Sequence, residues 1–284
     1  RSFRMRKLRI VLICVFCLVL GGVIGSLGTT RVAVQGLVSP QKADRQPIVF
    51  VPGSGGTNDR FDQLFKTVNQ HYRQHSILKV EVMADGQVKT KGQIVWRDKV
   101  PLIVVSFENN NDGDENVFKQ TEWFEKAMQQ LTKQYHFKKF NGVGYSNGGL
   151  VLTRYAERYP KEAQLSRLLT IGTPYNGLNA SIKDESPMLT DLKSQKEHLS
   201  KKMVVYSVGG TTTGGDDGIV PASSVAAGRE VFQNQIAHYM SMFVSGNDAK
   251  HTSLPENETI VYLIEELIVQ QPVDPQKPLS AKLK

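Results

Sequence analysis

A serine between two glycines is the first feature of this sequence that could do chemistry. Residues 140–150 read FNGVGYSNGGL, which places Ser146 in a Gly-x-Ser-x-Gly pattern at the end of an apolar run. The pattern is typical of a nucleophile elbow, a sharp turn from strand to helix that lifts the serine Oγ out of the sheet. Gly144 and Gly148 supply the small neighbours that such strained backbone requires. Glycines also flank serines in ordinary loops, so the rest of the chain must supply a base and a carboxylate.

Two histidines are candidates for the base. A serine hydroxyl is a weak nucleophile until a base takes its proton, and a carboxylate must orient that base. Of the six histidines, only His238 and His251 follow the pair of aspartates discussed next. His238 falls within an apolar run, where we expect a packed structural histidine. His251 falls in a polar loop before the last helix, and we predict that it is the base.

Two adjacent aspartates are candidates for the acid. Residues 214–221 read GGDDGIVP and follow a predicted strand, so Asp216 and Asp217 lie in a turn at the end of that strand. We favour Asp217, because a glycine and an apolar pair follow it directly. Asp216 remains the alternative, and its other role would be to form the turn.

Strand-like and helix-like segments alternate along the chain. This alternation predicts an α/β fold with a mostly parallel sheet and helices on both faces. An antiparallel hairpin around Asp85-Gly86 is expected at the sheet edge, and residues 178–201 are expected to form a short cap over the site, with Met188 and Leu189 as isolated apolar points. The predicted strands are 48–51, 77–82, 87–95, 100–107, 140–145, 165–171, 203–208 and 236–244, and the predicted helices are 60–73, 117–135, 146–158 and 257–269.

Two loops could suggest a bound ion or nucleotide. The glycine-rich loop 52–58 follows the first strand, but no Gly-Lys-Ser/Thr follows it, which excludes a Walker-type phosphate loop. The acidic run 108–115 resembles a calcium loop, but the register that puts Gly113 sixth has Lys119 at the twelfth position instead of glutamate. We therefore expect a solvated loop near the site, with no metal and no cofactor.

The positive charge is concentrated at the N-terminus. The chain of 284 residues has a formal charge of +8, but six of its 35 basic residues lie in the first 31 residues, which contain no acidic residue. The remainder is close to neutral, which argues against a nucleic-acid partner. With 40% hydrophobic residues, the chain is long enough for one large core.

Residues 8–27 are almost wholly apolar and long enough to cross a bilayer as a helix. We favour an uncleaved signal anchor with the following domain outside the cell, by the positive-inside rule; a cleaved signal peptide and a secreted domain are the alternative. Cys14 and Cys17 both fall in this segment, so the exported part has no disulfide, as is ordinary at a Gram-positive surface. The expected organisation is 1–28 anchor or signal peptide, 29–46 linker, 47–270 catalytic domain and 271–284 disordered tail.

Taken together, the motifs resemble the α/β-hydrolase superfamily, and within it the membrane-anchored or exported serine hydrolases of Gram-positive bacteria. The order serine, aspartate, histidine is that of α/β-hydrolases. The resemblance implies an α/β-hydrolase fold and an oxyanion hole made by the backbone N–H groups of Ser54 and Asn147. One departure concerns the first loop, where the family often has His-Gly and this chain has Pro52-Gly53. The motifs are 51–57, 144–149, 172–177, 217–221 and His251.

The resulting hypothesis is a serine hydrolase, of carboxylesterase or lipase type, that cleaves an ester-type bond at the cell surface. Ser146 would attack, His251 would transfer the proton, and Asp217 would orient His251. The expected substrate is a small molecule or an acyl group of lipid or cell-wall material, and the chain is expected to act as a monomer held to the membrane by its N-terminal helix. The alternative is a non-catalytic surface module that keeps the fold for binding.

Overall fold

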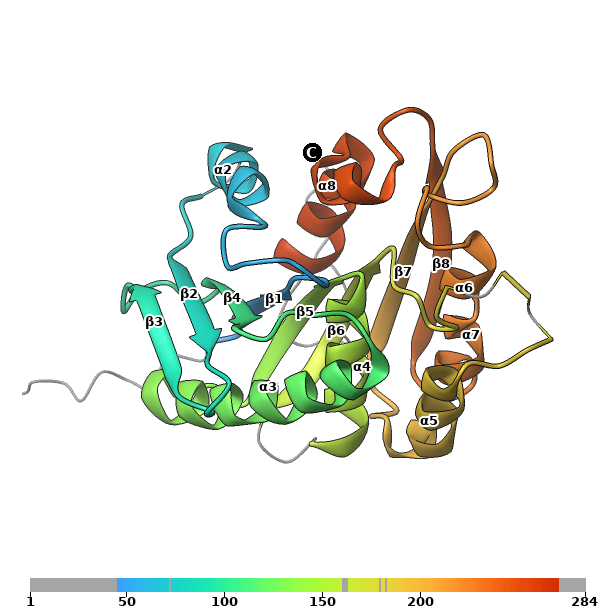
Figure 1. Ribbon diagram of the computed structural model, residues 1–284. Helices are drawn as coiled ribbons and strands as arrows, with labels where there is room; N and C mark the ends of the chain where they lie inside the picture. The colour runs from blue at the N-terminus through green and yellow to red at the C-terminus, as the bar shows by residue number, and fades with distance from the viewer. Residues whose placement is uncertain (1–44, 72, 160–162, 179, 182, 271–284) are drawn as a thin grey trace, which may run out of the picture. The chain divides into compact units, whose positions relative to one another are not determined.

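A computed structural model describes residues 45–270, except 72, 160–162, 179 and 182 (Figure 1). The predicted anchor, the tail and all but the last two residues of the predicted linker lie outside the described residues. Within the described part, no helix is long and apolar enough to cross a membrane.

The described residues are organised around one eight-stranded sheet, in the order β3-β2-β4-β1-β5-β6-β7-β8. All neighbouring strands are parallel except β2 and β3, which form the predicted antiparallel hairpin at the edge. The predicted mostly parallel α/β sheet is therefore confirmed. The strands are β1 (Ile48–Val51), β2 (Ile77–Val82), β3 (Val88–Gly92), β4 (Leu102–Phe107), β5 (Lys139–Tyr145), β6 (Gln164–Ile171), β7 (Val204–Thr211) and β8 (His238–Ser245).

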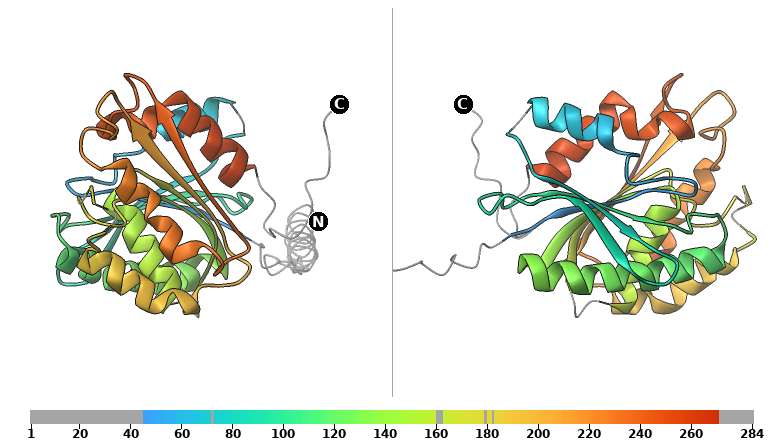
Figure 2. Two further views of the ribbon diagram at one scale, coloured as in Figure 1. Left: turned by 90° about the vertical axis from the view of Figure 1, so that its right-hand side faces the viewer. Right: turned by 60° about the vertical axis from the view of Figure 1, so that its left-hand side comes forward.

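Helices cover both faces of this sheet, as the right-hand view of Figure 2 shows. Along β1, Val49 and Val51 point into one apolar cluster, whereas Ile48 and Phe50 point into the other. The first cluster includes residues of α3, α4, α5 and α7, and the second includes residues of α2 and α8. The helices are α2 (Asp62–His71), α3 (Asp114–Tyr135), α4 (Asn147–Arg158), α5 (Pro187–Gln195), α6 (Ala222–Ala226), α7 (Gly228–Phe232) and α8 (Glu258–Ile264), with shorter helical turns η1 (Lys196–His198), η2 (His251–Glu256) and η3 (Glu265–Val269).

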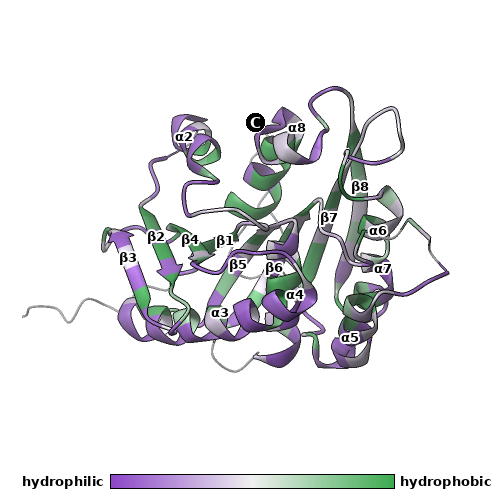
Figure 3. Ribbon diagram, viewed as in Figure 1, coloured by the Kyte–Doolittle hydropathy of each residue, from purple (hydrophilic) through white to green (hydrophobic). Residues whose placement is uncertain are grey.

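This two-sided burial explains why the central strands are continuous apolar runs. A parallel strand with helices on both faces has no side exposed to solvent. Its residues are therefore apolar throughout and do not alternate between apolar and polar. Figure 3 shows the hydrophobic colour concentrated in the sheet, while the outer surfaces of the helices are hydrophilic.

The segment 178–201 differs from its prediction. Met188 and Leu189 are not isolated apolar points, because α5 buries both of them together with Leu192 in the cluster shared with α3 and α4. Their spacing puts all three on one helical face, which drives the helix onto the core. Of the described residues in this segment, only Leu178 lines the pocket at Ser146. The expected cap is therefore mostly a helix of the core layer.

His238 also differs from its prediction. The last strand begins at His238 instead of residue 236, and the histidine is exposed, not packed. Because β8 pairs only with β7, it is an edge strand, and its apolar residues do not imply burial of their neighbours.

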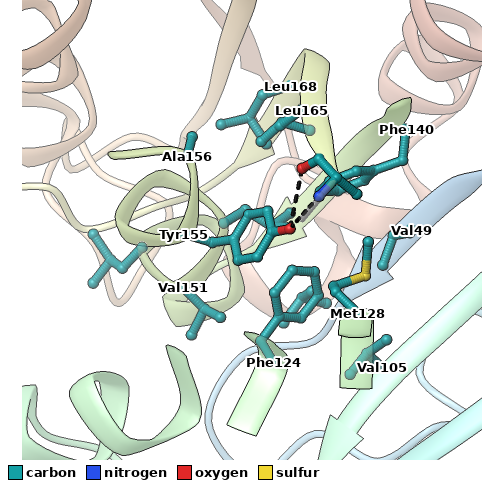
Figure 4. Close-up of a cluster of buried hydrophobic side chains, with 14 of the residues drawn as sticks. Val49, Val105, Phe124, Met128, Phe140, Val151, Tyr155, Ala156, Leu165 and Leu168 are labelled. Carbon is teal, nitrogen blue, oxygen red and sulfur yellow. Dashed lines mark hydrogen bonds between the residues drawn. The ribbon is translucent and has the colours of Figure 1, made fainter. Parts of the chain in front are cut away.

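Tyr155 of α4 fixes this helix to the sheet layer (Figure 4). Its ring is fully buried and contacts Phe124 and Phe140 edge to face, with centroid distances of 4.9 and 5.7 Å. Its hydroxyl donates to the carbonyl of Ala163 at 3.0 Å and accepts from the N–H of Ala163 at 3.3 Å. The chain entering β6 is therefore tied to α4 by a buried polar contact.

Removing that hydroxyl should destabilise the fold. Tyr155→Phe keeps the ring but leaves both backbone groups of Ala163 without this partner, which should cost about 1–3 kcal/mol of unfolding free energy. Urea denaturation monitored by circular dichroism measures this loss. The matched control is Tyr262→Phe, because Tyr262 is exposed and its hydroxyl makes no hydrogen bond within the described residues. Equal stability of the two variants would contradict the role given to Tyr155.

Candidate active site

Ser146 lies at the sharp turn between β5 and α4, as the glycine pattern predicts. Its backbone has φ 52° and ψ −128°, a conformation that costs energy for a residue with a side chain. Hydrogen bonds hold it there: its N–H donates to Ile171 at 2.8 Å, and its carbonyl accepts from Gly149 N–H at 3.0 Å and from Thr173 Oγ1 at 3.0 Å. Hydrogen bonds to the end of β6 and to the loop after it therefore stabilise the strained conformation of Ser146.

The glycines around Ser146 permit close backbone approach. A Cβ on Gly148 would lie 2.1 Å from the carbonyl oxygen of Val51, and one on Gly144 would lie 2.5 Å from Gly149 Cα. A Cβ on Gly149 would lie 2.0 Å from Thr173 Oγ1, a constraint that the sequence analysis missed. The end of β1, the elbow and the loop after β6 therefore meet at van der Waals distance.

His251 connects Ser146 to Asp217. His251 Nε2 is 3.1 Å from Ser146 Oγ, and Nδ1 is 2.7 Å from Asp217 Oδ2. Asp217 is 1% exposed, and its Oδ1 accepts hydrogen bonds from the N–H groups of Ile219 at 3.0 Å and Val220 at 2.7 Å. These donors suit an ionised carboxylate, which in turn accepts a proton-bearing Nδ1 and leaves Nε2 to face the serine.

The neighbouring Asp216 has a different role. Its Oδ1 accepts from the N–H of Gly218 at 2.9 Å, which closes the turn. Of the two candidate carboxylates, Asp217 is therefore the one that contacts His251.

Tyr145 and Arg60 support the segment that carries His251. The Tyr145 hydroxyl donates to the carbonyl of His251 at 3.0 Å, and the Arg60 guanidinium lies 4.8 Å from the Tyr145 ring centroid. Arg60 also donates to the carbonyl of Thr252 at 2.7 Å. Burial raises the pKa of Tyr145, while Arg60 opposes that rise. Tyr145 stands inside the Gly-x-Ser-x-Gly motif, but no motif in the sequence predicted its contact with His251 or pointed to Arg60.

The loop after β1 lies directly against the nucleophile. A Cβ on Gly53 would lie 2.5 Å from Ser146 Cβ, so the backbone passes beside the serine where an oxyanion loop is expected. The Asn147 side-chain amide donates to Ser54 Oγ at 2.8 Å and to Asp112 Oδ1 at 2.6 Å. The buried Asn147 side chain therefore links the two predicted oxyanion residues, Asn147 and Ser54, to each other and to the loop that contains Asp112.

The loop that contains Asp112 is the acidic run expected to be solvated near the site. The loop does lie near the site, as predicted, and it also bonds the glycine-rich loop after β1. Asp112 accepts from Ser54 Oγ at 3.3 Å, and the N–H of Gly55 donates to the carbonyl of Asn110 at 2.8 Å. These hydrogen bonds hold the acidic loop against the glycine-rich loop, just after Pro52. Within the described residues, no group of three or more His, Cys, Asp or Glu side chains could hold a metal ion.

A pocket of about 390 Å³ opens over Ser146. One side is acidic, with Asp112 and Asp114; burial raises the pKa of Asp114, and the nearby charge of Asp112 raises it further. Leu178 and Ile219 at its rim are 61% and 52% exposed, which offers an apolar surface to a substrate. The apolar lining is Leu150, Pro174, Leu178, Ile219 and Val220.

The sheet topology and this arrangement at the carboxyl ends of its strands are those of an α/β hydrolase. The chain belongs to the family described as alpha/beta hydrolase of unknown function (DUF915), whose model matches residues 38–271. A comparison with curated proteins found no match.

Solved structures agree with this membership. A protein from Lactobacillus plantarum assigned as a cell surface hydrolase is 37% identical, with 81% of this chain and 94% of that chain covered and a TM-score of 0.73. A gene product of Listeria innocua is 29% identical, with 81% and 95% covered and a TM-score of 0.73. A lipase-esterase related protein from Clostridium acetobutylicum is 13% identical, with 80% and 96% covered and a TM-score of 0.50, and shares the fold.

The close contact at Gly148 gives a test of the elbow. Gly148→Ala forces a methyl group against the β1 carbonyl, and we expect a loss of about 1–3 kcal/mol of unfolding free energy, as for other overpacked sites. Urea denaturation measures it. Gly214→Ala is the control, because a Cβ there would meet nothing closer than 3.7 Å. A Gly148→Ala variant as stable as this control would show that the elbow does not need the close approach.

Proposed function

We propose that this protein is a serine hydrolase that cleaves ester-type bonds through Ser146, His251 and Asp217. The observation that carries the proposal is the series of hydrogen bonds from Ser146 Oγ to His251 Nε2 and from His251 Nδ1 to Asp217. A base within hydrogen-bond reach of the hydroxyl, and a carboxylate that orients the base, are what activation of a serine requires.

The reaction follows from this geometry. Ser146 Oγ attacks the ester carbonyl carbon while His251 Nε2 takes the hydroxyl proton, and Asp217 stabilises the resulting imidazolium. The backbone N–H groups of Ser54 and Asn147 would bind the developing oxyanion. His251 then gives the proton to the leaving alkoxide, and a water molecule, activated by His251, releases the acyl group from Ser146.

The substrate is an ester whose acyl part meets the apolar rim at Leu178 and Ile219. Membership in an α/β-hydrolase family supports hydrolase activity. The related Lactobacillus plantarum protein is assigned to the cell surface, and the apolar segment 8–27 gives this chain a means of being held there. We place the domain outside the cell, either anchored as a monomer by that segment or secreted after its cleavage.

Loss of the nucleophile tests the proposal. Ser146→Ala should lower the hydrolysis of p-nitrophenyl butyrate by the full chain at least about 10³-fold, since removing a triad serine removes the acyl-enzyme route. Release of p-nitrophenol measures it. Ser194→Ala is the matched control, because the Ser194 hydroxyl on α5 bonds only the carbonyl of Asp191 and the side-chain amide of Gln195, and Ser194 does not line the pocket at Ser146. Turnover by Ser146→Ala at the control's rate would refute the assignment.

Labelling separates this enzyme from the alternative of a binding module with the same fold. A fluorophosphonate reacts with an activated serine, so the wild-type chain should be labelled at Ser146. A chain that is never labelled would favour the binding module.

The contacts of Asn147 predict a second effect on rate. Asn147→Ala keeps the backbone N–H but releases Ser54 and Asp112, so the oxyanion donors lose their mutual alignment. We expect kcat to fall about 10- to 100-fold, the scale of a small misplacement at a reacting centre, with a smaller change in KM. Steady-state kinetics on p-nitrophenyl butyrate measure both.

The control for Asn147 is Asn111→Ala, in the loop that contains Asp112. Asn111 is exposed, and its side chain bonds only Asn109. Its kcat should match the wild type. If Asn147→Ala also keeps the wild-type kcat, the side chain does not order the oxyanion loop.

A further inference from the structure

A second cavity, of about 630 Å³, adjoins the pocket at Ser146. It lies where β7 and β8 end: Thr211 and Ser245 are paired neighbours, and the loops after both strands rise together at the upper right of Figure 1. The two cavities share three lining residues, Ile219, His251 and Thr252, so they adjoin each other at His251. We name the second cavity the lateral groove; its lining is Thr211, Thr212, Thr213, Asp217, Gly218, Ile219, Ser245, Gly246, Asn247, Lys250, His251 and Thr252.

The lateral groove contains polar side chains that the fold does not use. Within the described residues, no side-chain hydrogen bond or ion pair involves Thr213, Ser245, Asn247 or Lys250. Thr211 and Thr212 differ, because their hydroxyls donate to the carbonyls of Val244 at 3.3 Å and Asp216 at 3.0 Å. Thr213, Ser245, Asn247 and Lys250 are exposed, so a ligand in the groove could replace solvent at their hydroxyl, amide and ammonium groups.

The groove contains one carboxylate, Asp217, and both of its oxygens already accept hydrogen bonds within the protein. Asp217 is buried, with Oδ2 bonded to His251 and Oδ1 to two backbone N–H groups. The remaining polar lining is neutral apart from Lys250. These side chains offer donors and acceptors to a hydroxylated group, whereas a plain alkyl group would use only the apolar part of the lining.

We propose that the lateral groove binds the alcohol part of the ester and that this alcohol is a polyol, such as a glycerol or sugar unit. The inference rests on the proposed function. His251 Nε2 is the group that returns the proton, so the C–O bond to the leaving oxygen breaks beside His251 and the alkoxide takes up that proton there. The predicted oxyanion residues Ser54 and Asn147 line only the pocket, whereas His251 lines both cavities. The acyl part therefore stays in the pocket at Ser146, and the alcohol extends past His251 into the lateral groove.

Two esters with one acyl group separate the contribution of the alcohol. The full wild-type chain should hydrolyse monobutyrylglycerol with a higher kcat/KM than ethyl butyrate, since only the former has hydroxyls for the groove. The double variant Thr213→Val/Asn247→Ala should lower kcat/KM for monobutyrylglycerol about 10-fold or more, as expected for two lost hydrogen bonds, and leave ethyl butyrate unchanged. Titration of butyric acid release measures both reactions.

The control variant is Thr67→Val, whose hydroxyl bonds only the carbonyl of Gln63 on α2. It should keep the wild-type ratio of the two kcat/KM values. An equal kcat/KM for both esters in the wild type, or an unchanged ratio in the double variant whose Ser146 still reacts with a fluorophosphonate, would overturn the polyol groove and leave the hydrolase standing. A wild-type chain that hydrolyses neither ester and whose Ser146 is never labelled would refute the proposed function itself.

Discussion

The strained backbone at Ser146 is the constraint on which the rest of the site depends. A residue with a side chain adopts φ 52° only where its surroundings hold it. Here the holding groups come from β6 and from the loop after it, while β1 approaches from the other side at Gly148. The three strands β1, β5 and β6 are neighbours in the sheet, so the parallel order of the sheet is what makes the elbow possible. A different strand order would separate Ser146 from these partners even if every residue of the site were kept.

Much of the fold could be predicted from the sequence, because the forces that form it leave local patterns. Continuous apolar runs marked the strands buried on both faces, and Asp85-Gly86 marked the edge hairpin. Segments with an incomplete pattern adopt structures that their sequence does not predict. Met188, Leu189 and Leu192 lie too close together within a polar segment to show a long helical period, yet one buried face is enough to bring α5 onto the core. At His238 the apolar run was real, but a run cannot show whether its strand lies in the middle of the sheet or at its edge.

The candidate site divides in the same way. Ser146, Asp217 and His251 were named from types and order, because their chemistry constrains both. The choice of Asp217 over Asp216 rested on the residues that follow it, and in the structure Asp217 Oδ2 lies 2.7 Å from His251 Nδ1. Tyr145 lies in the Gly-x-Ser-x-Gly motif and Asp112 in the acidic loop expected near the site, but the contacts of Arg60, Tyr145 and Asp112 left no such trace. These contacts join residues far apart in the chain: Arg60 reaches Thr252, and Asp112 reaches Asn147. A contact between distant segments depends on tertiary geometry, which no local spacing encodes.

Asp112 presents a physical conflict that its hydrogen bonds resolve. A carboxylate near a site where negative charge develops would oppose that charge, and more strongly where water is excluded. Asp112, however, accepts hydrogen bonds from the Asn147 amide, the Ser54 hydroxyl and the N–H of Gly113. Such bonds to an ionised acceptor are stronger than neutral ones and polarise their donors. Asp112 is also exposed, so solvent and salt screen the charge that these donors do not offset. Asp112 thus holds Asn147 through a short, charge-assisted bond of 2.6 Å and Ser54 through a longer one of 3.3 Å. The same donors reduce the field that Asp112 exerts at the reacting centre.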